Sequence, residues 1–400
     1  MRLENDTPHA VDAATARRQA ALLAFALIAI TMGVNLHVPL YPAIAALDGL
    51  GLAATTIAFS FYVAGILPVL LCLGSLSDRI GHKPVIAGAL ALSGVATLIM
   101  ALSPHIGTLA VARLLLGVGT ALMSVTALAY MSEILAGAVE AGAANWVAAS
   151  TALGFGVGPF ITTLTLYSGA SLAPPSYAIH IAGVALAGLL LLLLPKRARR
   201  APSSLPMLRL PSYPPGSLWF GVAIALAWAT SGLIISILPA VLAQHGLARW
   251  SGATTLMAVS CGLLFQPAAR RCHPVRAVSI GLLTLVPAFG ILAFGALQGQ
   301  LALVLLGALL ASSACYGFVY LGGLAGVAAL AGDDKARVSA GFFILAYVGY
   351  SVPVVFTGVV ADSYGKQAAL TVFGAVLALG VGALLCWRRA GSAEAIKQAA

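Results

Sequence analysis

The sequence predicts an all-α membrane protein of twelve transmembrane helices, arranged as two pseudo-symmetric six-helix bundles, and three observations carry this prediction. Hydrophobic residues make up 61% of the 400 residues and charged residues only 8%, which is more apolar surface than a soluble chain could bury. The apolar residues fall into twelve runs, each close to the ~20 residues that a helix needs to cross a bilayer. Backbone groups in lipid must be paired within their own segment, so the runs are predicted to be helices.

The runs set the predicted domain boundaries. A polar tail covers 1–19, a first six-helix bundle 20–194, a linker 195–216, a second six-helix bundle 217–387 and a tail 388–400. The first tail lacks the short apolar core of a signal peptide, and the linker is rich in Arg, Pro and Ser, as polar connections are. The predicted spans are 20–46, 53–76, 84–103, 106–131, 140–167, 175–194, 217–243, 250–269, 277–297, 300–331, 338–361 and 367–387.

The basic residues predict the orientation of the chain. The net charge is +10, but the 21 Lys and Arg residues lie mostly in the connections between runs, so no nucleic-acid partner is expected. With a cytoplasmic N-terminus, 18 of the 21 face the cytoplasm, Arg249 and Lys366 face outside, and Arg113 lies within a span. This bias predicts an inner-membrane protein with both termini in the cytoplasm. The 18 residues are Arg2, Arg17, Arg18, Arg79, Lys83, Lys196, Arg197, Arg199, Arg200, Arg209, Arg270, Arg271, Arg276, Lys335, Arg337, Arg388, Arg389 and Lys397.

Other function classes lack the residues that they need. The sequence has no Walker motif, which argues against an ATP-driven pump. The five cysteines show neither a C-x-x-C pair nor zinc spacing, so no metal and no cofactor are expected. A membrane enzyme would need a convergent cluster of His, Asp and Glu residues or a metal site, and none stands out. A membrane enzyme is therefore not expected, and a protein that senses without transporting is an alternative that only a flux assay excludes.

The second and third runs are joined by a compact charged turn, Gly74-Ser-Leu-Ser-Asp78-Arg79-Ile-Gly81-His82-Lys83. The turn resembles the corresponding loop of the major facilitator superfamily, roughly G-x-L-x-D-R-x-G-R-K, with His82 where the family usually carries Arg. The resemblance implies two bundles that alternate access to a midplane site, with this turn as a conformational latch. Asp78 would cap a helix N-terminus of the facing half, and His82 and Lys83 would pair with Glu133. A generic polar turn is the alternative.

Weaker echoes of these patterns occur in the second half. The segment Gly358-Val-Val-Ala-Asp362-Ser-Tyr-Gly365-Lys366 resembles the charged turn, but it follows the eleventh run and is predicted to face outside. Leu40-Tyr-Pro-Ala in the first run has a partial echo, Ile237-Leu-Pro-Ala, in the seventh. These echoes suggest, but do not establish, an internal repeat.

Two spans of the first half carry polar side chains that are costly in lipid. Asn35 and His37 lie in Gly33-Val-Asn-Leu-His-Val-Pro-Leu-Tyr-Pro, which resembles the first-span motif of the twelve-span drug:proton antiporter branch. Arg113 begins Arg-Leu-Leu-Leu-Gly-Val-Gly-Thr-Ala121, which resembles the family motif R-x-x-x-G-x-G-x-A. All three residues are predicted to bind substrate or couple protons. Interhelical hydrogen bonding remains open for His37. For Arg113, bonding to carbonyls of the first span, or snorkelling to the surface, remains open.

The fifth span contains Ala152-Leu-Gly-Phe-Gly-Val-Gly-Pro159, whose G-x-x-x-G-P core resembles the antiporter motif of exporters in this superfamily. Gly154, Gly158 and Pro159 are therefore predicted to pack closely against a neighbouring helix, which we expect to be the eighth span. The match ends at Thr162-Thr163, where the full motif has a pair of glycines. Ordinary packing of small residues is the alternative.

The second half supplies candidates for a cavity wall, namely Trp228, Gln266, Tyr316, Tyr320 and Tyr347. Tyr316 and Tyr320 are four residues apart and share a helix face. Aromatic walls suit amphipathic ligands, although lipid-facing or core packing is an equal alternative for each residue.

The titratable groups inside the spans predict the substrate charge. All eleven acidic residues lie outside the span interiors, which argues for neutral or anionic rather than cationic substrates. The buried titratable groups are His37, His180 and Arg113, and a His can carry a coupling proton. The predicted function is a secondary active transporter: a monomeric, proton-coupled exporter of a small amphipathic neutral or anionic compound, with that molecule, protons and lipid as its partners. An importer or facilitator of a small organic anion, centred on Arg113, is the alternative.

Overall fold

The computed structural model describes residues 13–74, 76–136, 142–167, 169, 171–195 and 210–399. Side chains are described as far as Arg388. Within these ranges every regular element is a helix. The first residues of the predicted N-terminal tail, 1–12, and most of the predicted linker, 196–209, lie outside the described residues.

Twelve helices of the described chain are long and apolar enough to cross a membrane, which confirms the predicted fold. The first span begins at Ala13, earlier than the predicted residue 20. The first bundle consists of α1 (Ala13–Asn35), η1 (Val38–Leu40), α2 (Tyr41–Leu47), α3 (Leu52–Cys72), α4 (Leu76–Ile80), α5 (His82–Leu102), α6 (Ile106–Leu135), α7 (Ala143–Leu166) and α8 (Pro175–Leu192). The second consists of α9 (Ser217–Ser236), α10 (Leu238–Ala243), η2 (Ala248–Trp250), α11 (Ser251–Ser260), η3 (Cys261–Phe265), α12 (Gln266–Arg270), α13 (Pro274–Leu297), α14 (Leu301–Ser312), η4 (Ser313–Val319), α15 (Tyr320–Leu330), α16 (Lys335–Tyr364) and α17 (Lys366–Ala399).

The first span of each bundle breaks at a proline. In the first bundle α1 ends at Asn35, and α2 restarts with Pro42 in its first turn. In the second bundle α9 ends at Ser236, and α10 restarts with Pro239 in its first turn. Proline has no N–H to donate to the preceding turn, so the first helix cannot continue through it, and the new helix carries the proline in its first turn, where no such N–H is needed. The weak sequence echo between these two segments therefore has a structural counterpart.

Two irregular helical segments lie side by side in the second bundle. The eighth span contains the 3₁₀ segment η3, and the tenth contains the π-helical segment η4. They meet at Gly262, whose N–H donates to Ser312 Oγ at 2.7 Å and where an added Cβ would lie 2.6 Å from Cβ of Tyr316. Segments in which an α-helix changes to 3₁₀ or π geometry often mark functional sites.

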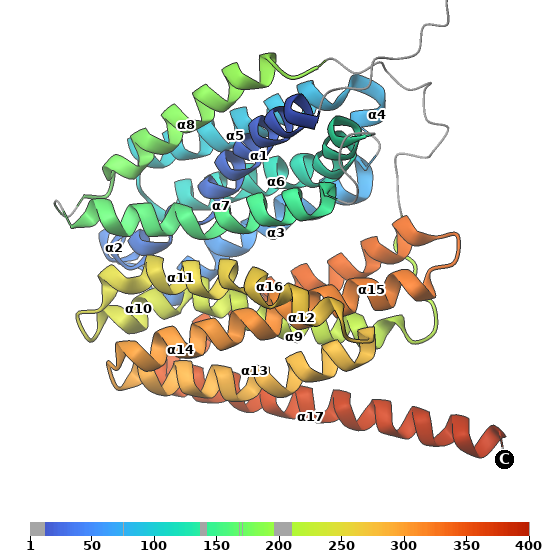
Figure 1. Ribbon diagram of the computed structural model, residues 1–400. Coiled ribbons are helices and arrows are strands. Elements are labelled where there is room, and N and C mark those ends of the chain that lie inside the picture. The colour runs from blue at the N-terminus through green and yellow to red at the C-terminus, as the bar shows by residue number, and fades with distance from the viewer. Residues whose placement is uncertain are drawn as a thin grey trace, which may run out of the picture.

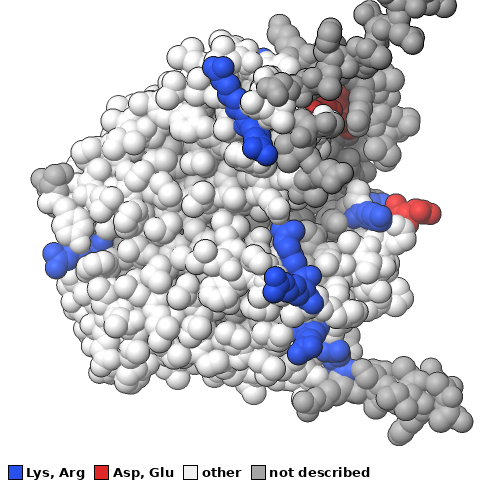
Figure 2. Space-filling view, viewed as in Figure 1, with Lys and Arg blue, Asp and Glu red and all other residues white. Residues whose placement is uncertain are grey.

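The helix ends define two sides of the molecule. We call the side where α8 ends and α9 begins the linker side, and the side where α2 ends and α3 begins the far side. Both ends of the described chain lie on the linker side (Figure 1). Basic side chains gather toward that side, with a smaller group at the far side (Figure 2). Arg249 and Lys366 are the basic residues at the far-side helix ends among the described residues.

Two helix pairs join the bundles, and the first, α7 with α11 and α12, is connected over its whole length. At the far side Gly252 N–H donates to Thr163 Oγ1 at 3.1 Å. At the linker side Arg270 Nη2 donates to Asn145 Oδ1 at 2.9 Å. We call this contact the α7–α11 seam.

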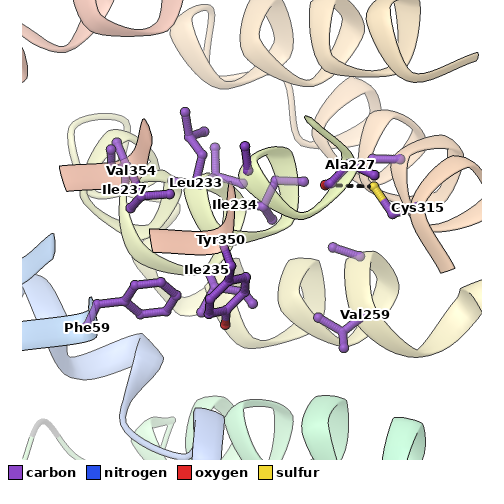
Figure 3. Close-up of a cluster of buried hydrophobic side chains, with 14 of the residues drawn as sticks. Phe59, Ala227, Leu233, Ile234, Ile235, Ile237, Val259, Cys315, Tyr350 and Val354 are labelled. Carbon is purple, nitrogen blue, oxygen red and sulfur yellow. Dashed lines mark hydrogen bonds between the residues drawn. The ribbon is translucent and has the colours of Figure 1, made fainter. Parts of the chain in front are cut away.

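The second pair, α3 with α16, is joined over its far half. Gly358 allows the close approach, because a Cβ there would lie 2.3 Å from Thr56 Oγ1. Phe59 then packs beside Tyr350, with ring centroids 4.9 Å apart (Figure 3). Below it Tyr62 reaches Tyr347, with centroids 6.4 Å apart.

The apolar core follows the same division. The larger buried cluster contains residues of both bundles, including Phe59 and Ile235, and is continuous across the interface (Figure 3). A second cluster belongs to the linker-side half of the first bundle alone and includes Leu23, Met131 and Leu191. The bundles are thus packed together at the far side and have separate cores toward the linker side.

Candidate functional site

Arg113 is a fully buried charge in the interior of the molecule, with an exposed fraction of 0%. Its Nη1 donates to the Val34 carbonyl on α1 at 2.7 Å, and its Nε donates to the Phe59 carbonyl on α3 at 3.2 Å. Its guanidinium carbon lies 4.4 Å from the ring centroid of Phe59 and 4.9 Å from that of Tyr62. A planar, weakly hydrated guanidinium tolerates such an aromatic site better than an ammonium would.

The geometry bears on the alternatives for this arginine. Arg113 is bonded to a carbonyl of the first span and points inward, so it does not snorkel to a surface. Its Nη2 has no hydrogen-bond partner among the described residues. Nε and Nη1 of the Arg113 guanidinium are therefore held by backbone carbonyls, whereas the two N–H groups of Nη2 have no acceptor among the described residues.

An aromatic cluster from the second bundle faces these residues. Tyr350 and Tyr347 on α16 approach Tyr62, with centroids 6.2 and 6.4 Å away. Trp228 on α9 contacts Tyr347 edge-on at 5.0 Å and stacks with Tyr320 at 6.4 Å. Edge-on and offset arrangements of this kind are the favourable ones for aromatic pairs.

Burial decreases along this cluster toward the linker side. Tyr350 and Tyr347 are 7% and 9% exposed, whereas Phe343, one turn closer to the linker side, and Trp228 and Tyr320 are half-buried. The far end of the cluster is thus sealed. Of the predicted second-half residues, Trp228, Tyr320 and Tyr347 are in direct ring contact.

Phe59 and Tyr62 complete the site, although the sequence reasoning missed both. They carry no charge and lie in a uniformly apolar run, so nothing in the composition separates them from lipid-facing residues. Their spacing of three residues, which places them on one face of α3, was the signal available.

Several buried polar atoms near Arg113 lack partners. Asn35 donates through Nδ2 to the Phe155 carbonyl at 3.1 Å, but its Oδ1 has no partner among the described residues. His37 Nδ1 lies 2.8 Å from the Tyr177 hydroxyl, and its Nε2 has none. Leaving a buried polar group unpaired costs about 1–3 kcal/mol, so this region suits water or a polar ligand. Among the described residues, the buried atoms without a partner at the first-span break, at Arg113 and in the aromatic cluster are Asn35 Oδ1, His37 Nε2, Tyr41 OH, Arg113 Nη2 and Trp228 Nε1.

Comparison with known proteins shows which family has this architecture. The family model of the Major Facilitator Superfamily matches residues 23–271, more than half of the chain. The chain belongs to the major facilitator superfamily.

Curated relatives match this superfamily member over a shorter stretch. It is 34% identical over 103 residues to "Multidrug resistance protein MdtL" of Shewanella oneidensis, covering 26% of each chain. It is 35% identical over 105 residues to "Solute carrier family 22 member 15" of Xenopus tropicalis, covering 26% of this chain and 18% of that one. The chain thus matches about a quarter or less of the length of these curated relatives.

Solved structures match over almost the whole chain. A crystal structure of the nucleoside transporter NupG has a TM-score of 0.76 at 14% identity, covering 93% of this chain and 99% of that one. The human organic anion transporter MFSD10 has a TM-score of 0.62 at 19% identity, covering 92% and 99%. These identities show the fold alone. Family and fold together identify a multi-pass membrane transporter rather than an enzyme.

The charged turn of this superfamily member lies on the linker side. His82 Nε2 is 3.3 Å from Glu133 Oε1, and the His82 ring stacks on Tyr130 with centroids 5.2 Å apart. Lys83 Nζ donates to the carbonyls of Leu192 and Leu194. The pairing expected for His82 is thus present, whereas the role of the turn as a latch stays a prediction.

The remaining residues of the turn are arranged around Gly81. Gly81 has φ +93°, which favours glycine, and Gly74 precedes α4. Arg79 is exposed and Asp78 is half-buried. No described residue donates a hydrogen bond to Asp78, so the expected helix cap is not formed with the described residues.

The fifth-span motif of this member packs differently from the expectation. A Cβ on Gly154 would lie 2.0 Å from Thr31 Oγ1, and one on Gly158 would lie 2.2 Å from the Met32 carbonyl oxygen, so both glycines face α1. Gly156, two residues from each, is the glycine that faces the eighth span, on α11. Residues four apart share a helix face and residues two apart do not, so the expected eighth-span partner was wrong for Gly154 and Gly158.

Pro159 supplies the remaining contact of the motif. A Cβ on Gly252 would lie 2.1 Å from the Pro159 carbonyl oxygen. The motif therefore fixes α7 between α1 on one face and α11 on the other, and it contributes to the α7–α11 seam.

Two further predicted residues have other surroundings. Gln266 is buried at the start of α12, one turn from Gly262, which packs against Tyr316. His180 is buried inside the first bundle, where Nε2 lies 2.9 Å from the Ala29 carbonyl and Nδ1 lies 2.8 Å from Thr97 Oγ1. Because a carbonyl only accepts, Nε2 carries the proton of the neutral ring.

We expect His180→Ala to destabilise the protein without uncoupling it. The substitution removes both hydrogen bonds of the ring and leaves the buried Thr97 hydroxyl without its partner, at a cost of about 1–3 kcal/mol. Thermal unfolding of purified protein should therefore start at a lower temperature, while the protein that remains folded still responds to a pH gradient. The exposed His245→Ala is the matched control. Equal unfolding temperatures for the two variants would contradict the structural role.

Proposed function

We propose that the chain is a proton-coupled exporter of a small amphipathic compound, neutral or anionic, that works by alternating access. One observation carries the proposal. Among the described residues, Arg113 is the only Lys, Arg, Asp or Glu that is buried, and its free Nη2 lies in a site walled by aromatic rings.

The sign of the buried charge supports this substrate class. A buried cation attracts an anionic or polar group and repels a cation, more strongly in the interior than in water. A carboxylate that could neutralise a lipophilic cation is missing from the buried set of the described residues. The aromatic cluster offers apolar faces to the rest of an amphipathic molecule.

The comparisons support export less directly. The bacterial relative MdtL is named a multidrug resistance protein, but the match covers 26% of the chain. MFSD10 is titled an organic anion transporter and shares the fold. The two names agree with a drug-like or metabolite-like cargo, and the charge argument selects the anionic or neutral members of that class.

His37 is the proposed proton carrier. Its Nδ1 pairs with the Tyr177 hydroxyl, which leaves Nε2 free to accept. A substrate that donates a hydrogen bond to the neutral Nε2 loses this acceptor when the ring is protonated. Protonation and substrate binding would then exclude each other, which is the condition for exchange of a proton against cargo.

The membrane orientation is part of the proposal. Among the described basic residues, those at helix ends lie mainly on the linker side, and two lie at the far side. We assign the linker side to the cytoplasm of a bacterial-type inner membrane on this basis, and we propose that the protein acts as a monomer. Asp78 of the charged turn would then stabilise the state that is closed to the cytoplasm, while the His82–Glu133 pair holds the turn within the first bundle.

The second candidate is an importer or facilitator of a small organic anion, which the free Nη2 of Arg113 would serve equally well. The direction of net flux under an imposed pH gradient separates the two. A sensor without transport would give no flux in either direction.

We expect His37→Ala to uncouple transport. In proteoliposomes, a pH gradient should drive the parent protein to exchange anionic or neutral compounds against protons. His37→Ala should lose about tenfold or more of this gradient dependence, because general acid–base groups typically contribute ~10²–10⁴-fold to proton transfer. Exchange of substrate for substrate at equal pH should persist, since Arg113 and the aromatic cluster are unchanged. His245→Ala is the control. Robust transport of cations with an unaffected His37→Ala would sink the proposal.

A further inference from the structure

Two turns at opposite sides of the molecule share one backbone geometry. Gly81 has φ +93° and ψ 160°, and Gly365 has φ +88° and ψ 161°. In both turns the glycine N–H donates to the carbonyl four residues earlier, at 2.9 and 3.0 Å. In both, an aspartate stands three residues before the glycine, Asp78 on the linker side and Asp362 on the far side.

The lysines that follow the two turns also behave alike. Lys83 Nζ donates to the Leu194 carbonyl near the end of α8, at 2.6 Å. Lys366 Nζ donates to the Ala240 carbonyl in α10, at 2.8 Å. Each lysine ties its turn to a helix of its own bundle, so each turn moves with the bundle that carries it.

The far-side turn is engaged with the other bundle. Asp362 Oδ1 accepts the Leu52 N–H and Oδ2 accepts the Ala53 N–H, both at 2.8 Å. These N–H groups belong to the first turn of α3, where a carboxylate is stabilising because the helix N-terminus carries a partial positive charge. The residue before the helix, Gly51, has no side chain to cap it, and a Cβ there would lie 2.3 Å from Asp362 Oδ2.

The linker-side turn is not engaged in the same way. By the symmetry of the two turns, Asp78 at the end of the second span corresponds to Asp362 at the end of the eleventh, and the N-terminus of α16 corresponds to that of α3. No described residue donates to Asp78, and α16 begins without a side-chain cap from Asp334. The two equivalent contacts are therefore in opposite states in this conformation, one formed and one open.

We propose that Asp362 and the first turn of α3 form a far-side latch, which holds the bundles together in this state and must release before the far side can open. The inference rests on the alternating access of the proposed function. A cap that comes from the other bundle exists only while the bundles touch at that place. Its free energy therefore belongs to one conformation and shifts the equilibrium between the two. Asp362 acts as a positioning residue for the bundles and does not touch the cargo.

The test measures the conformation without substrate or pH gradient. Spin labels at Leu102 and Gln298, both exposed at the far side on different bundles, report the opening of that side. Labels at Ser132 and Arg271 report the linker side. Cys315 is buried and can stay, and the accessible cysteines are replaced by serine: Cys72, Cys261, Cys272 and Cys386.

Asp362→Asn should populate longer far-side distances and shorter linker-side distances, with about a threefold or larger rise in the ratio of far-side-open to far-side-closed molecules. Asp333→Asn makes the same chemical change at an exposed position on the linker side and should change neither distance. Gly51→Ala should act like Asp362→Asn without altering any charge, because the added methyl displaces the carboxylate. Gly107→Ala, where a Cβ meets nothing within 4 Å, is its control.

Asp78→Asn supplies a test of opposite sign. Asp78 is the carboxylate that would cap α16 when the linker side is closed. Its removal disfavours that conformation, so the far side should stay closed. Unchanged distances in both Asp362→Asn and Gly51→Ala would overturn the latch, and so would an equal shift in Asp333→Asn. Because the labels need neither cargo nor protons, the latch and the proposed substrate class can fail independently.

Discussion

Arg113→Ala is expected to abolish transport of anionic substrates almost completely while lowering that of neutral ones less. The substitution removes the buried cation of the described part of the chain together with its free Nη2. A hydrogen bond to a charged group is worth about 1.5–3 kcal/mol, which corresponds to about 10- to 150-fold in affinity. The assay is initial flux in proteoliposomes against matched neutral and anionic compounds, normalised to the amount of folded protein.

Arg113→Lys is the informative companion. Lysine keeps the charge and can reach one carbonyl, but it lacks the planar fork that bonds Val34 and Phe59 together while lying over two rings. We expect flux between those of the parent and of Arg113→Ala, with the preference for anions retained. If Arg113→Ala transports anions at the parent rate, the charge argument for the substrate class is wrong.

Gly158→Ala is expected to cause a large loss of stability for the addition of a single methyl group. The added Cβ would lie 2.2 Å from the Met32 carbonyl oxygen on α1. That atom belongs to the backbone and cannot turn aside as the tip of a side chain can. Overpacking of this kind costs about 1–3 kcal/mol or more, and it would push α7 away from the kinked first span that carries Asn35 and His37.

Gly183→Ala on α8 is the control, because a Cβ there meets nothing within 4 Å. Alanine is favoured over glycine inside a helix by about 1 kcal/mol, so this variant should unfold at the same temperature or slightly higher. The difference in unfolding temperature between Gly158→Ala and Gly183→Ala therefore measures the cost of forcing the added methyl group against α1. Matching unfolding temperatures would show that α1 and α7 can separate without cost.

The spans were predictable from the sequence because the cost of burying polar backbone in lipid forces long apolar helices. Arg113 was predictable for the same reason, since a charge at membrane depth stands out against 61% hydrophobic residues. Phe59 and Tyr62 were not, because an aromatic ring that lines a site and one that faces lipid have the same local sequence. Their role appears only when α16 brings Tyr347 and Tyr350 opposite them.

Contacts between the bundles also escaped the sequence. The turn around Asp362 was visible as an echo of the turn around Asp78, but its partner lies 310 residues away on α3. The glycines of the fifth span predicted close packing, but the expected eighth-span partner was wrong for Gly154 and Gly158, because both faces of α7 carry glycine. Such choices depend on how the halves dock, and local patterns do not encode docking.

The unequal attachment of the two helix pairs has a mechanical consequence. The α7–α11 seam is bonded from Thr163 to Asn145, whereas α3 and α16 are joined in their far half. Two bundles that are joined along the whole of one helix pair and only in one half of the other pair are expected to separate by rotating about the fully joined pair. We therefore expect the cargo to pass between α3 and α16, where the opening would face the bilayer sideways. An amphipathic molecule dissolved in the bilayer leaflet on the linker side could then enter without first crossing water.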